Sequence, residues 1–382
     1  MKTILFIVED IDITNKLKTN FLIEILKEYL NIIAISPKSK GIKKMYEKKG
    51  NVFIYRYPQY EAFKLTGYFL EYPLSFLFTF LYFLYFLFTQ NFNILHLTIQ
   101  PSYYFLLILL AKIFKRKIIV DIWDFGDELF KERFGNIKLI KKLLLSSDKI
   151  LIRNSDLVLC HTKYHRQKIE KVLRIKKNVI EYYGAIDAYS VPQKPSRDIV
   201  VLNRSLLKRH DGIIEFLEVV KMFDEKFPSS PVKFIILGYG ELYEYAKNFI
   251  ALHRLEKRIT ITGFIPDKLE YLKMICDAKV CIGTDVSSAF NEYSLSMKYI
   301  EYLWAGKPVI SWQTKVLTDY LKDYIYLIKN NDKEAMVDSI YQFTTNPDLS
   351  EKYSRLAKKA YETIFSYSAQ KNLLVQEFKK LL

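Results

Sequence analysis

The chain has 382 residues, 50% of them apolar, with 12 Gly and 11 Pro; this suffices for two domains with separate cores and excludes a fibrous or largely disordered protein. The formal net charge is +16 at pH 7, and residues 1–190 carry +12 of it, from 30 Lys and Arg against 18 Asp and Glu. Such a basic half indicates contact with an anionic lipid surface or with nucleic acid, although a generally basic proteome gives the same excess.

The N-terminal sequence MKTILFIVEDID predicts the buried first strand of a cytoplasmic protein. Its apolar run is too short for a secretory signal peptide and meets acidic residues at once. The three cysteines, Cys160, Cys276 and Cys281, lack zinc-ligand spacing. We therefore expect each of them to be a small core residue in a reducing compartment.

The first half of the chain alternates short apolar runs with helical stretches. Continuous apolar strands separated by helices indicate a parallel sheet that is covered on both faces. The expected strands are residues 4–8, 31–36, 52–57, 94–99, 117–123, 157–162 and 178–183. We predict that residues 1–190 form a Rossmann-like domain.

The same alternation starts again after residues 191–198, which are rich in Pro, Ser and charge and are typical of a linker. The expected strands are residues 199–204, 233–240, 258–265, 279–284, 307–311 and 324–328. The fold class is therefore α/β, with two doubly wound domains in tandem. We assign residues 199–360 to the second domain and residues 361–382 to a C-terminal helix that returns to the first. The default ligand site is the cleft between the two domains.

Residues 72–111 contain no charged side chain, and residues 74–88 consist almost wholly of Leu, Phe and Tyr. At about 1.5 Å per residue this run reaches only ~22 Å, short of the ~30 Å hydrocarbon core of a membrane. Because a strand follows it, we predict that residues 60–90 form a helix of the first domain and not a transmembrane span. A helix that is apolar all round must be covered by a partner, by another helix or by lipid.

Clusters of Lys and Arg occur in the same domain, and apolar surface beside basic side chains is typical of proteins that lie on anionic membranes. We therefore expect contact with an anionic membrane surface; the alternative is a buried helix with solvated charges. The clusters are Lys38, Lys40, Lys43, Lys44, Lys48 and Lys49, then Lys112, Lys115, Arg116 and Lys117, then Lys138, Lys141 and Lys142. Nucleic acid is not an expected partner, because no helix-turn-helix, RRM or KH signature organises the charge.

Residues 296–310 predict a helix that ends at Gly306 and a buried strand that starts at Pro308. Lys298 and Glu301 are three residues apart near the helix start and share one face. A helix N-terminus with a Lys can hold a phosphate, and a carboxylate one turn later can accept hydrogen bonds from ribose hydroxyls. The alternative is an ion pair between the two side chains on the surface.

The stretch Glu301–Val309, EYLWAGKPV, resembles the retaining GT-B glycosyltransferases of glycosyltransferase family 4, and further matches follow in order over most of the chain. The resemblance implies that Glu301 binds the nucleotide ribose and Lys298 the diphosphate. Many members carry a second Glu, on the donor sugar, eight positions before the first. That position here is Tyr293, and the adjacent Glu292 is our candidate for the role.

The strand end Val201–Arg204 is similar to the family's Gly-Arg-Leu strand end, which implies that Arg204, Arg209 and the adjacent Lys208 grip the diphosphate. Fixed cations there would stabilise the charge that develops on the leaving nucleotide diphosphate. Ordinary surface basicity is the alternative. Gly238 resembles part of the family's Gly-x-Gly turn, although a tight turn between strand and helix needs the same residue.

In the first domain, Asp124 resembles the Asp of the family's strand-end His-Asp or Arg-Asp pair, with Trp123 in place of the basic residue. The resemblance implies that Asp124 contacts the acceptor or the donor sugar; a helix cap is the alternative. The family's glycine-rich loop after the first strand is replaced by residues 9–12, Glu-Asp-Ile-Asp. His161 and His165 could line a cleft, but core histidines are the simpler expectation.

The resemblance implies a hexosyltransferase-type enzyme that moves a sugar from a nucleotide-diphosphate donor with retention and without a metal. The expected acceptor is polyprenyl-linked or a surface glycan, at the inner face of the cell membrane. No nucleophile set stands out, and the resemblance implies that none is required, because the leaving phosphate helps to deprotonate the acceptor hydroxyl. The protein would then supply mainly orientation and electrostatics. A catalytically silent sugar-nucleotide-binding or partner protein remains the main alternative. A GT-A enzyme with Asp10 and Asp12 as its metal site and a sugar-nucleotide epimerase are less favoured.

Overall fold

The structure is a computed structural model that describes residues 1–8, 17–38, 44–58, 65–98, 104–135, 137–186, 191, 199–206, 212–288 and 290–381. The chain forms two compact units. Unit 1 comprises Met1–Gly184 and Gln370–Leu382, and unit 2 comprises Ala185–Ala369. Most of the expected linker, residues 192–198, lies outside the described residues.

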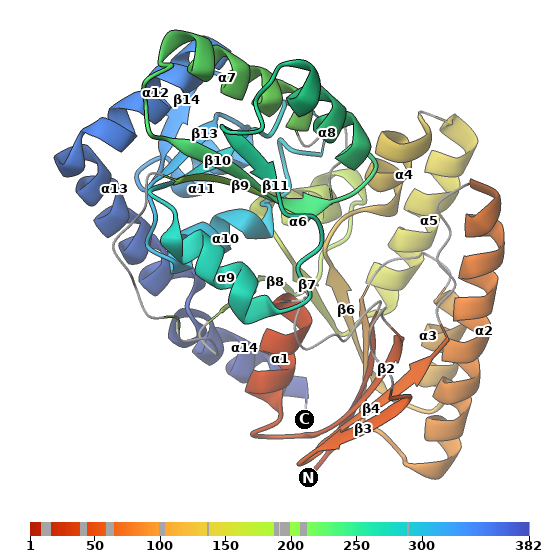
Figure 1. The fold of residues 1–382 in the computed structure, drawn as a ribbon. Coiled ribbons are helices and arrows are strands. Elements are labelled where there is room, and N and C mark those ends of the chain that lie inside the picture. Colours follow the sequence, from red (N-terminus) through yellow and green to blue (C-terminus); the bar gives the residue numbers. More distant parts are fainter. Residues whose placement is uncertain are drawn as a thin grey trace. The chain divides into compact units, whose positions relative to one another are not determined.

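Unit 1 contains an eight-stranded sheet with the order β3-β4-β2-β1-β5-β6-β7-β8 (Figure 1). All neighbouring strands are parallel except β3, which pairs antiparallel with β4 at one edge. The strands are β1 (Thr3–Ile7), β2 (Asn31–Pro37), β3 (Tyr46–Lys49), β4 (Val52–Tyr57), β5 (Ile94–Thr98), β6 (Lys117–Ile122), β7 (Leu157–Cys160) and β8 (Val179–Glu181). Strand β3 was not predicted, because its sequence, YEKK, has none of the apolar character of a buried strand.

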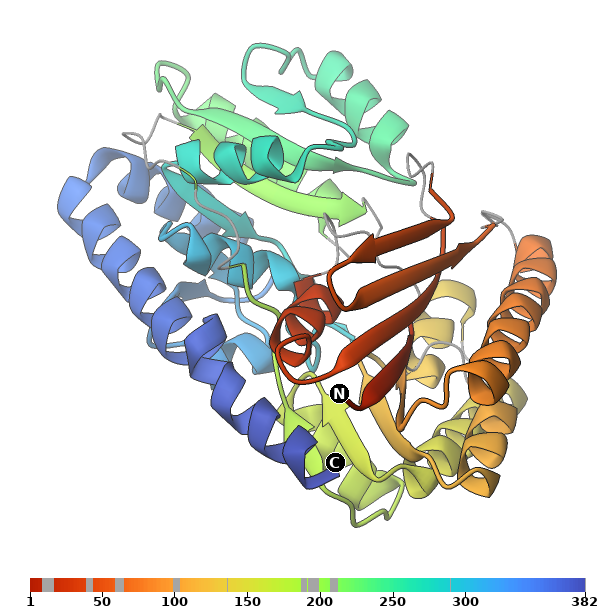
Figure 2. The same cartoon turned by 90° about the horizontal axis from the view of Figure 1, so that it is seen from below.

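Helices cover both faces of this sheet (Figure 2). Phe86, Leu107 and Leu151 come from three different helices and join one hydrophobic cluster with the sheet, so α2, α3 and α5 lie on the same face. Helices α1 and α14 lie on the other face, where Lys371 pairs with Glu28 at 2.8 Å. The helices are α1 (Leu17–Leu26), α2 (Leu65–Thr89), α3 (Phe105–Ile113), α4 (Gly126–Phe134), α5 (Lys138–Asn154), α6 (Lys163–Gln167) with the π-helical turn η1 (Lys168–Val172), and α14 (Tyr367–Leu381).

The long apolar segment is helix α2, and it belongs to unit 1 as predicted. Phe83 and Phe86 are fully buried against the sheet, and Leu87 is nearly so. No helix within the described residues is both long and apolar enough to cross a membrane.

Unit 2 contains a six-stranded parallel sheet with the order β11-β10-β9-β12-β13-β14 (Figure 1). Its strands are β9 (Ile199–Leu206), β10 (Lys233–Tyr239), β11 (Ile259–Ile261), β12 (Val280–Gly283), β13 (Val309–Trp312) and β14 (Tyr326–Ile328). Its helices are α7 (Ile213–Lys226), α8 (Tyr243–Leu252), α9 (Lys268–Asp277), α10 (Met297–Trp304), α11 (Lys315–Leu321), α12 (Lys333–Thr345) and α13 (Pro347–Ala360), followed by the π-helical turn η3 (Tyr361–Phe365). Two doubly wound α/β units are what the sequence predicts.

The chain returns to unit 1 through α14, as expected. The backbone N–H of Tyr183 donates to Oε1 of Gln370 at 2.6 Å, and Nδ2 of Asn178 donates to Oε2 of Glu377 at 2.8 Å. Leu374 and Phe378 are buried, so the helix contributes to the core of unit 1.

Candidate functional site

The carboxyl ends of three parallel strands meet at one edge of the sheet in unit 2. Val201 on β9 pairs with Ile235 on β10 and with Cys281 on β12, so β9 lies between the other two. Ligands of doubly wound sheets bind at this edge. Arg204 lies on β9, but its side chain, together with Lys208 and Arg209, lies outside the part of the chain that the structure describes.

Gly212 brings the end of the loop after β9 against the end of β12. Its φ is +70°, a conformation that favours glycine. A Cβ at Gly212 would lie 1.8 Å from the carbonyl oxygen of Thr284. The described residues on either side of Lys208 and Arg209, Leu206 and Gly212, therefore lie at the same edge of the sheet.

Lys298 is buried at this edge, in the first turn of α10. Its Nζ lies 2.9 Å from Oδ2 of Asp285, which follows β12. The hydroxyl of Tyr299 donates to the same carboxylate and lies 2.8 Å from Oγ of Ser311. Lys298 and Asp285 are both only 4% exposed, so the network fixes the ammonium in place.

Glu301 is held by two residues of α9. Its Oε1 accepts a 2.7 Å hydrogen bond from Nζ of Lys268, and its Oε2 accepts one from the hydroxyl of Tyr271. Glu301 and Lys268 are both buried. The alternative of a surface ion pair between Lys298 and Glu301 is therefore wrong, because each is buried and pairs with another residue.

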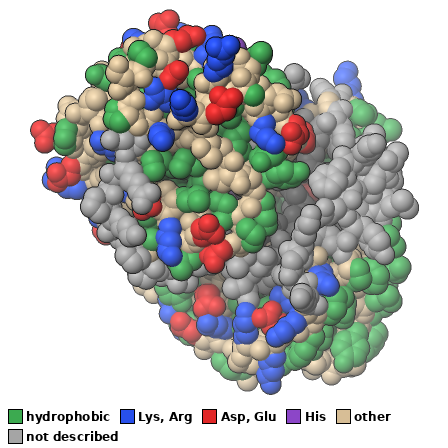
Figure 3. Space-filling view, viewed as in Figure 1, with side chains coloured by type: hydrophobic (Ala, Val, Ile, Leu, Met, Phe, Trp, Pro, Cys, Tyr) green, Lys and Arg blue, Asp and Glu red, His purple; other side chains and the backbone are tan. Residues whose placement is uncertain are grey.

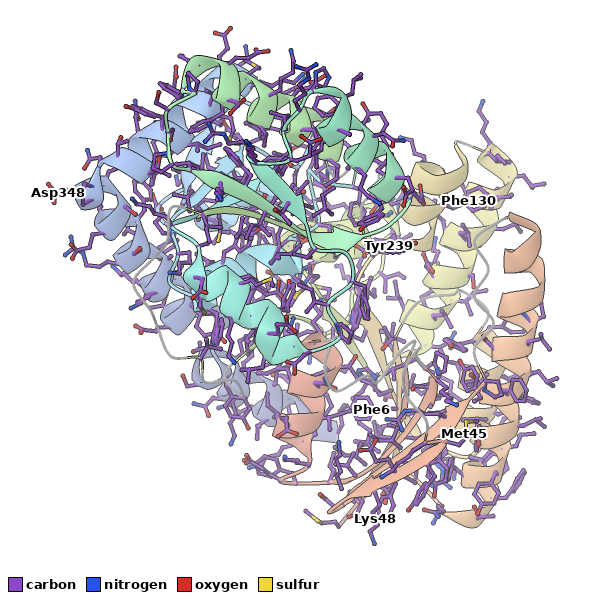
Figure 4. The ribbon with its side chains drawn as sticks, in the orientation of Figure 1. Phe6, Met45, Lys48, Phe130, Tyr239 and Asp348 are labelled. Carbon is purple, nitrogen blue, oxygen red and sulfur yellow. The ribbon has the colours of Figure 1, made fainter. Side chains whose placement is uncertain are left out.

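Gly238 is the last residue but one of β10 and lies beside the segment that follows β11. It forms an isolated antiparallel bridge with Gly263, the second residue after β11. The next residue, Tyr239, is 55% exposed, and its ring centroid lies 5.0 Å from that of Tyr243 (Figure 4). The turn therefore presents an exposed aromatic side chain at the carboxyl edge of the sheet.

Glu292 has contacts that anchor its own loop. Its Oε1 accepts a hydrogen bond from Oγ of Ser287, and its Oε2 accepts one of 2.7 Å from the backbone N–H of Lys315 at the start of α11. Glu292 thus lies between the loop after β12 and helix α11, at the same edge of the sheet as Lys298.

Asp124 lies in unit 1, after β6, and is half-buried. The N-cap position of α4 is occupied by Phe125 and not by Asp124. The buried carboxylate at this point is Asp121, which accepts hydrogen bonds from Nε1 of Trp123 at 2.9 Å and from the hydroxyl of Tyr182. Burial lowers the pKa of the nearby Lys18 to about 8, although the carboxylates of Asp121 and Asp124 oppose that shift.

Residues 173–363 match the family described as glycosyl transferases group 1, a stretch that is half of the chain and contains the whole sheet of unit 2. The chain belongs to this family. None of the curated proteins matches the sequence closely enough to count as a relative.

Solved structures share the glycosyltransferase fold along the whole chain. Sucrose-phosphate synthase from Thermosynechococcus elongatus is 13% identical, with a TM-score of 0.77 over 100% of this chain and 99% of that one. HepE from Anabaena, solved with UDP and glucose, is 13% identical, with a TM-score of 0.71 over 99% and 100%. A glycosyltransferase from Rickettsia africae is 17% identical, with a TM-score of 0.68 over 100% and 98%. The GT-B fold predicted from the sequence is confirmed.

Sequence reasoning missed several partners in this glycosyltransferase. Lys268 and Tyr271 are three residues apart on α9, a helix that is capped by Asp267. This spacing, which places two side chains on one helix face, is the only sequence signal that could have indicated them. Asp121 is a carboxylate within the buried, otherwise apolar part of β6, which is the signal that could have identified it.

His161, His165 and the three cysteines of the glycosyltransferase are buried, as expected. Oγ1 of Thr162 lies 2.8 Å from Nδ1 of His165, whose pKa burial lowers to about 3. Burial also raises the pKa of Cys160 to about 12, so this thiol stays protonated near neutral pH.

Proposed function

We propose that this glycosyltransferase transfers a hexose from a nucleotide-diphosphate donor, with retention of configuration and without a metal cofactor. The observation that carries the proposal is the pair of buried, fixed side chains on α10. Lys298 presents a cation at the carboxyl edge of the sheet, and Glu301 presents a carboxylate one turn later. HepE, which shares the fold, is solved with UDP and glucose.

Each charged group has a role in this proposal. Glu301 accepts hydrogen bonds from the ribose hydroxyls, which still leaves it bonded to α9 because a carboxylate has about four acceptor positions. Lys298, with Arg204, Lys208 and Arg209, meets the charge of the diphosphate as it leaves. Gly238 allows the backbone to approach the nucleotide closely.

The proposal also covers the acceptor, which we assign to unit 1. We propose that Asp124 and Glu292 contact the transferred sugar and the acceptor hydroxyl. The acceptor is a polyprenyl-linked or surface glycan at the inner face of the cell membrane, where the basic charge of residues 1–190 favours anionic lipid.

The main competing function is a catalytically silent protein that binds a sugar nucleotide or assists glycan assembly. It is favoured by Tyr293, which stands where many family members carry a second Glu, and by the carboxylate of Glu292, whose hydrogen bonds with Ser287 and Lys315 anchor a loop. Turnover separates the two functions.

The first test is a thermal-shift screen with UDP-, GDP- and ADP-sugars on the full chain. A nucleotide at 100 times its Kd stabilises the fold by about 2.7 kcal/mol. We expect the sugar nucleotides of one base to raise the unfolding temperature of the wild-type chain. This rise should be lost in Glu301→Gln and in Arg204→Ala. It should be kept in Glu362→Gln, which replaces an exposed glutamate on η3. No shift with any nucleotide would count against a donor site.

The second test measures release of nucleoside diphosphate in membrane extracts that contain polyprenyl-phosphate-linked acceptors. We expect release by the wild-type chain and none by Glu301→Gln. Binding of a sugar nucleotide without release in every acceptor mixture would favour the silent function.

A further inference from the structure

The outer surface of the α2, α3 and α5 layer of unit 1 is apolar and exposed. On α2, Phe83 and Phe86 face the sheet, whereas Leu77, Leu81 and Tyr85, at intervals of four residues, lie on the opposite side of the helix. Leu81 is 53% exposed, and Phe88, near the end of the helix, is 69% exposed. Green, apolar side chains follow the right-hand edge of Figure 3, where α2 runs in Figure 1.

Helix α3 continues this surface. Its exposed residues Phe105, Leu109 and Ile113 are again spaced by four, opposite the buried Leu107 and Ala111. The two helices meet at their C-terminal ends, where the rings of Phe88 and Phe114 lie edge to face with centroids 5.5 Å apart. The outward stripes therefore belong to neighbouring helices of one layer and face the same way.

Among the described side chains of α2, α3 and α5, the exposed charges have one sign. Residues 73–89 of α2 and the whole of α3 contain no Asp or Glu, and the single acidic residue of α5, Asp148, is fully buried. The exposed basic side chains of α5 are Lys138, Lys141, Lys142 and Arg153. Lys112 of α3 joins the two helices by donating to Oδ1 of Asn154 at 2.9 Å.

We infer that the outer surface of α2, α3 and α5 docks on an anionic lipid bilayer, with the three helices lying in the plane of the interface. Exposed aliphatic and aromatic side chains enter the boundary of the acyl region, and the Lys and Arg side chains of α5 contact lipid phosphates. This deepens the membrane location proposed above by naming the surface and its partner.

A second copy of the chain fits this surface less well. A two-fold interface places each patch against itself, so the basic side chains of one α5 would face those of the other. The phosphates of nucleic acid would pair with the basic side chains of α5. The exposed apolar side chains of α2 and α3 would stay in water, which costs free energy in proportion to their area.

Vesicle flotation of the full chain tests the inference directly. We expect binding to phosphatidylcholine vesicles that contain phosphatidylglycerol at low salt, and much weaker binding to phosphatidylcholine alone or at about 0.5 M salt, where exposed charges are screened. Equal binding to both lipid compositions would contradict the proposal that the lipid must be anionic. No binding to either would contradict the proposal that this surface docks on a membrane.

Two variants and one control locate the contact. Substituting Leu81, Tyr85 and Leu109 together with Ser removes the apolar stripe and leaves the buried core intact; substituting Lys138 and Lys142 with Glu reverses the charge. Each should weaken vesicle binding by roughly tenfold or more.

A matched charge reversal in unit 2, Lys257→Glu with Lys322→Glu, replaces exposed side chains and should leave vesicle binding unchanged. Loss of binding in this control as well would mean that net charge alone, and not the surface of α2, α3 and α5, determines attachment.

The same samples separate this inference from the proposed activity. The unfolding temperature without ligand shows that each variant folds, and the thermal shift with sugar nucleotide reports the donor site independently of lipid. Sedimentation without vesicles detects a dimer, and a dimer that dissociates in the Ser variant while vesicle binding is absent would assign the surface to self-association.

Discussion

Glu301 shows how a single carboxylate is held in place by residues far away in the sequence. Lys268 and Tyr271 donate to its two oxygens from another helix, and they precede Glu301 by 33 and 30 positions. Their donors hold the carboxylate in one orientation, with capacity left for further hydrogen bonds. In the proposed donor site, Lys268 is therefore a positioning residue.

Replacing Lys268 with Met should weaken nucleotide binding by roughly tenfold, because a buried carboxylate that has lost its cation is expensive to keep ionised and ordered. The matched control is Lys273→Met, an exposed lysine on the same helix, which should bind as the wild type does. Calorimetric titration with the nucleotide found in the screen measures both. Unchanged affinity in Lys268→Met would show that Glu301 does not depend on this pair.

Two buried histidines predict how the stability depends on pH. Burial lowers the pKa of His96 to about 4 and that of His165 to about 3, from near 6.5 in the unfolded chain. Below pH 6.5 the unfolded state therefore binds protons that the folded state does not. The free energy of unfolding should fall as the pH drops from 6.5 towards 4, by up to about 1.4 kcal/mol per pH unit for each histidine.

Urea unfolding at a series of pH values measures this slope. In His165→Gln the slope between pH 6 and pH 4.5 should be smaller than in the wild type, because one of the two proton-linked groups is gone. Lys18 and Lys168 both lie close enough to disfavour a charge on His165, so they add to the effect of burial. Identical slopes would exclude His165 as a source of acid instability.

At the scale of elements, the sequence was sufficient to predict the strands with apolar runs and the helices that end in helix-stop residues. The strands β10 and β12 and the helix α10, which ends before Gly306, follow from apolar runs and helix-stop residues. Strand β3 could not be predicted, because its pairing with β4 depends on the turn at Gly50 and not on apolar side chains. The partners of Glu301 could not be predicted either, since a contact between α9 and α10 depends on packing and has no local pattern.

Gly212 offers a test of how closely α7 and β12 approach each other. Gly212→Ala should destabilise the protein by about 1–3 kcal/mol more than Gly50→Ala, because only at Gly212 does a Cβ overlap a backbone carbonyl. Gly50 has a similar positive φ, +60°, but a Cβ added there would have no atom within 4 Å. Gly50→Ala should therefore cost only the backbone strain of an alanine at this φ, about 1 kcal/mol. Chemical denaturation compares the two. Equal losses would mean that the contact with Thr284 relaxes freely.

At the scale of the whole molecule, helix α14 joins the C-terminal end of the chain to unit 1. Leu374 is 1% exposed and Leu373 is 48% exposed, so the two adjacent leucines form a natural comparison. Leu374→Ala should lower the free energy of unfolding by about 2–5 kcal/mol, whereas Leu373→Ala should change it by less than about 0.5 kcal/mol. Urea midpoints measure both; similar values would show that α14 contributes little to the core of unit 1.

Helix α14 also sets the order in which the molecule matures. A ribosome makes residues 1–184 first, then the whole of unit 2, and only afterwards the segment that docks beside β8. The first unit therefore waits, incomplete, while its neighbour is synthesised, and its unfinished surface near Asn178 stays uncovered throughout that interval. Nascent chains stalled before residue 370 should therefore expose unit 1 near Asn178 and be the form that chaperones and proteases meet.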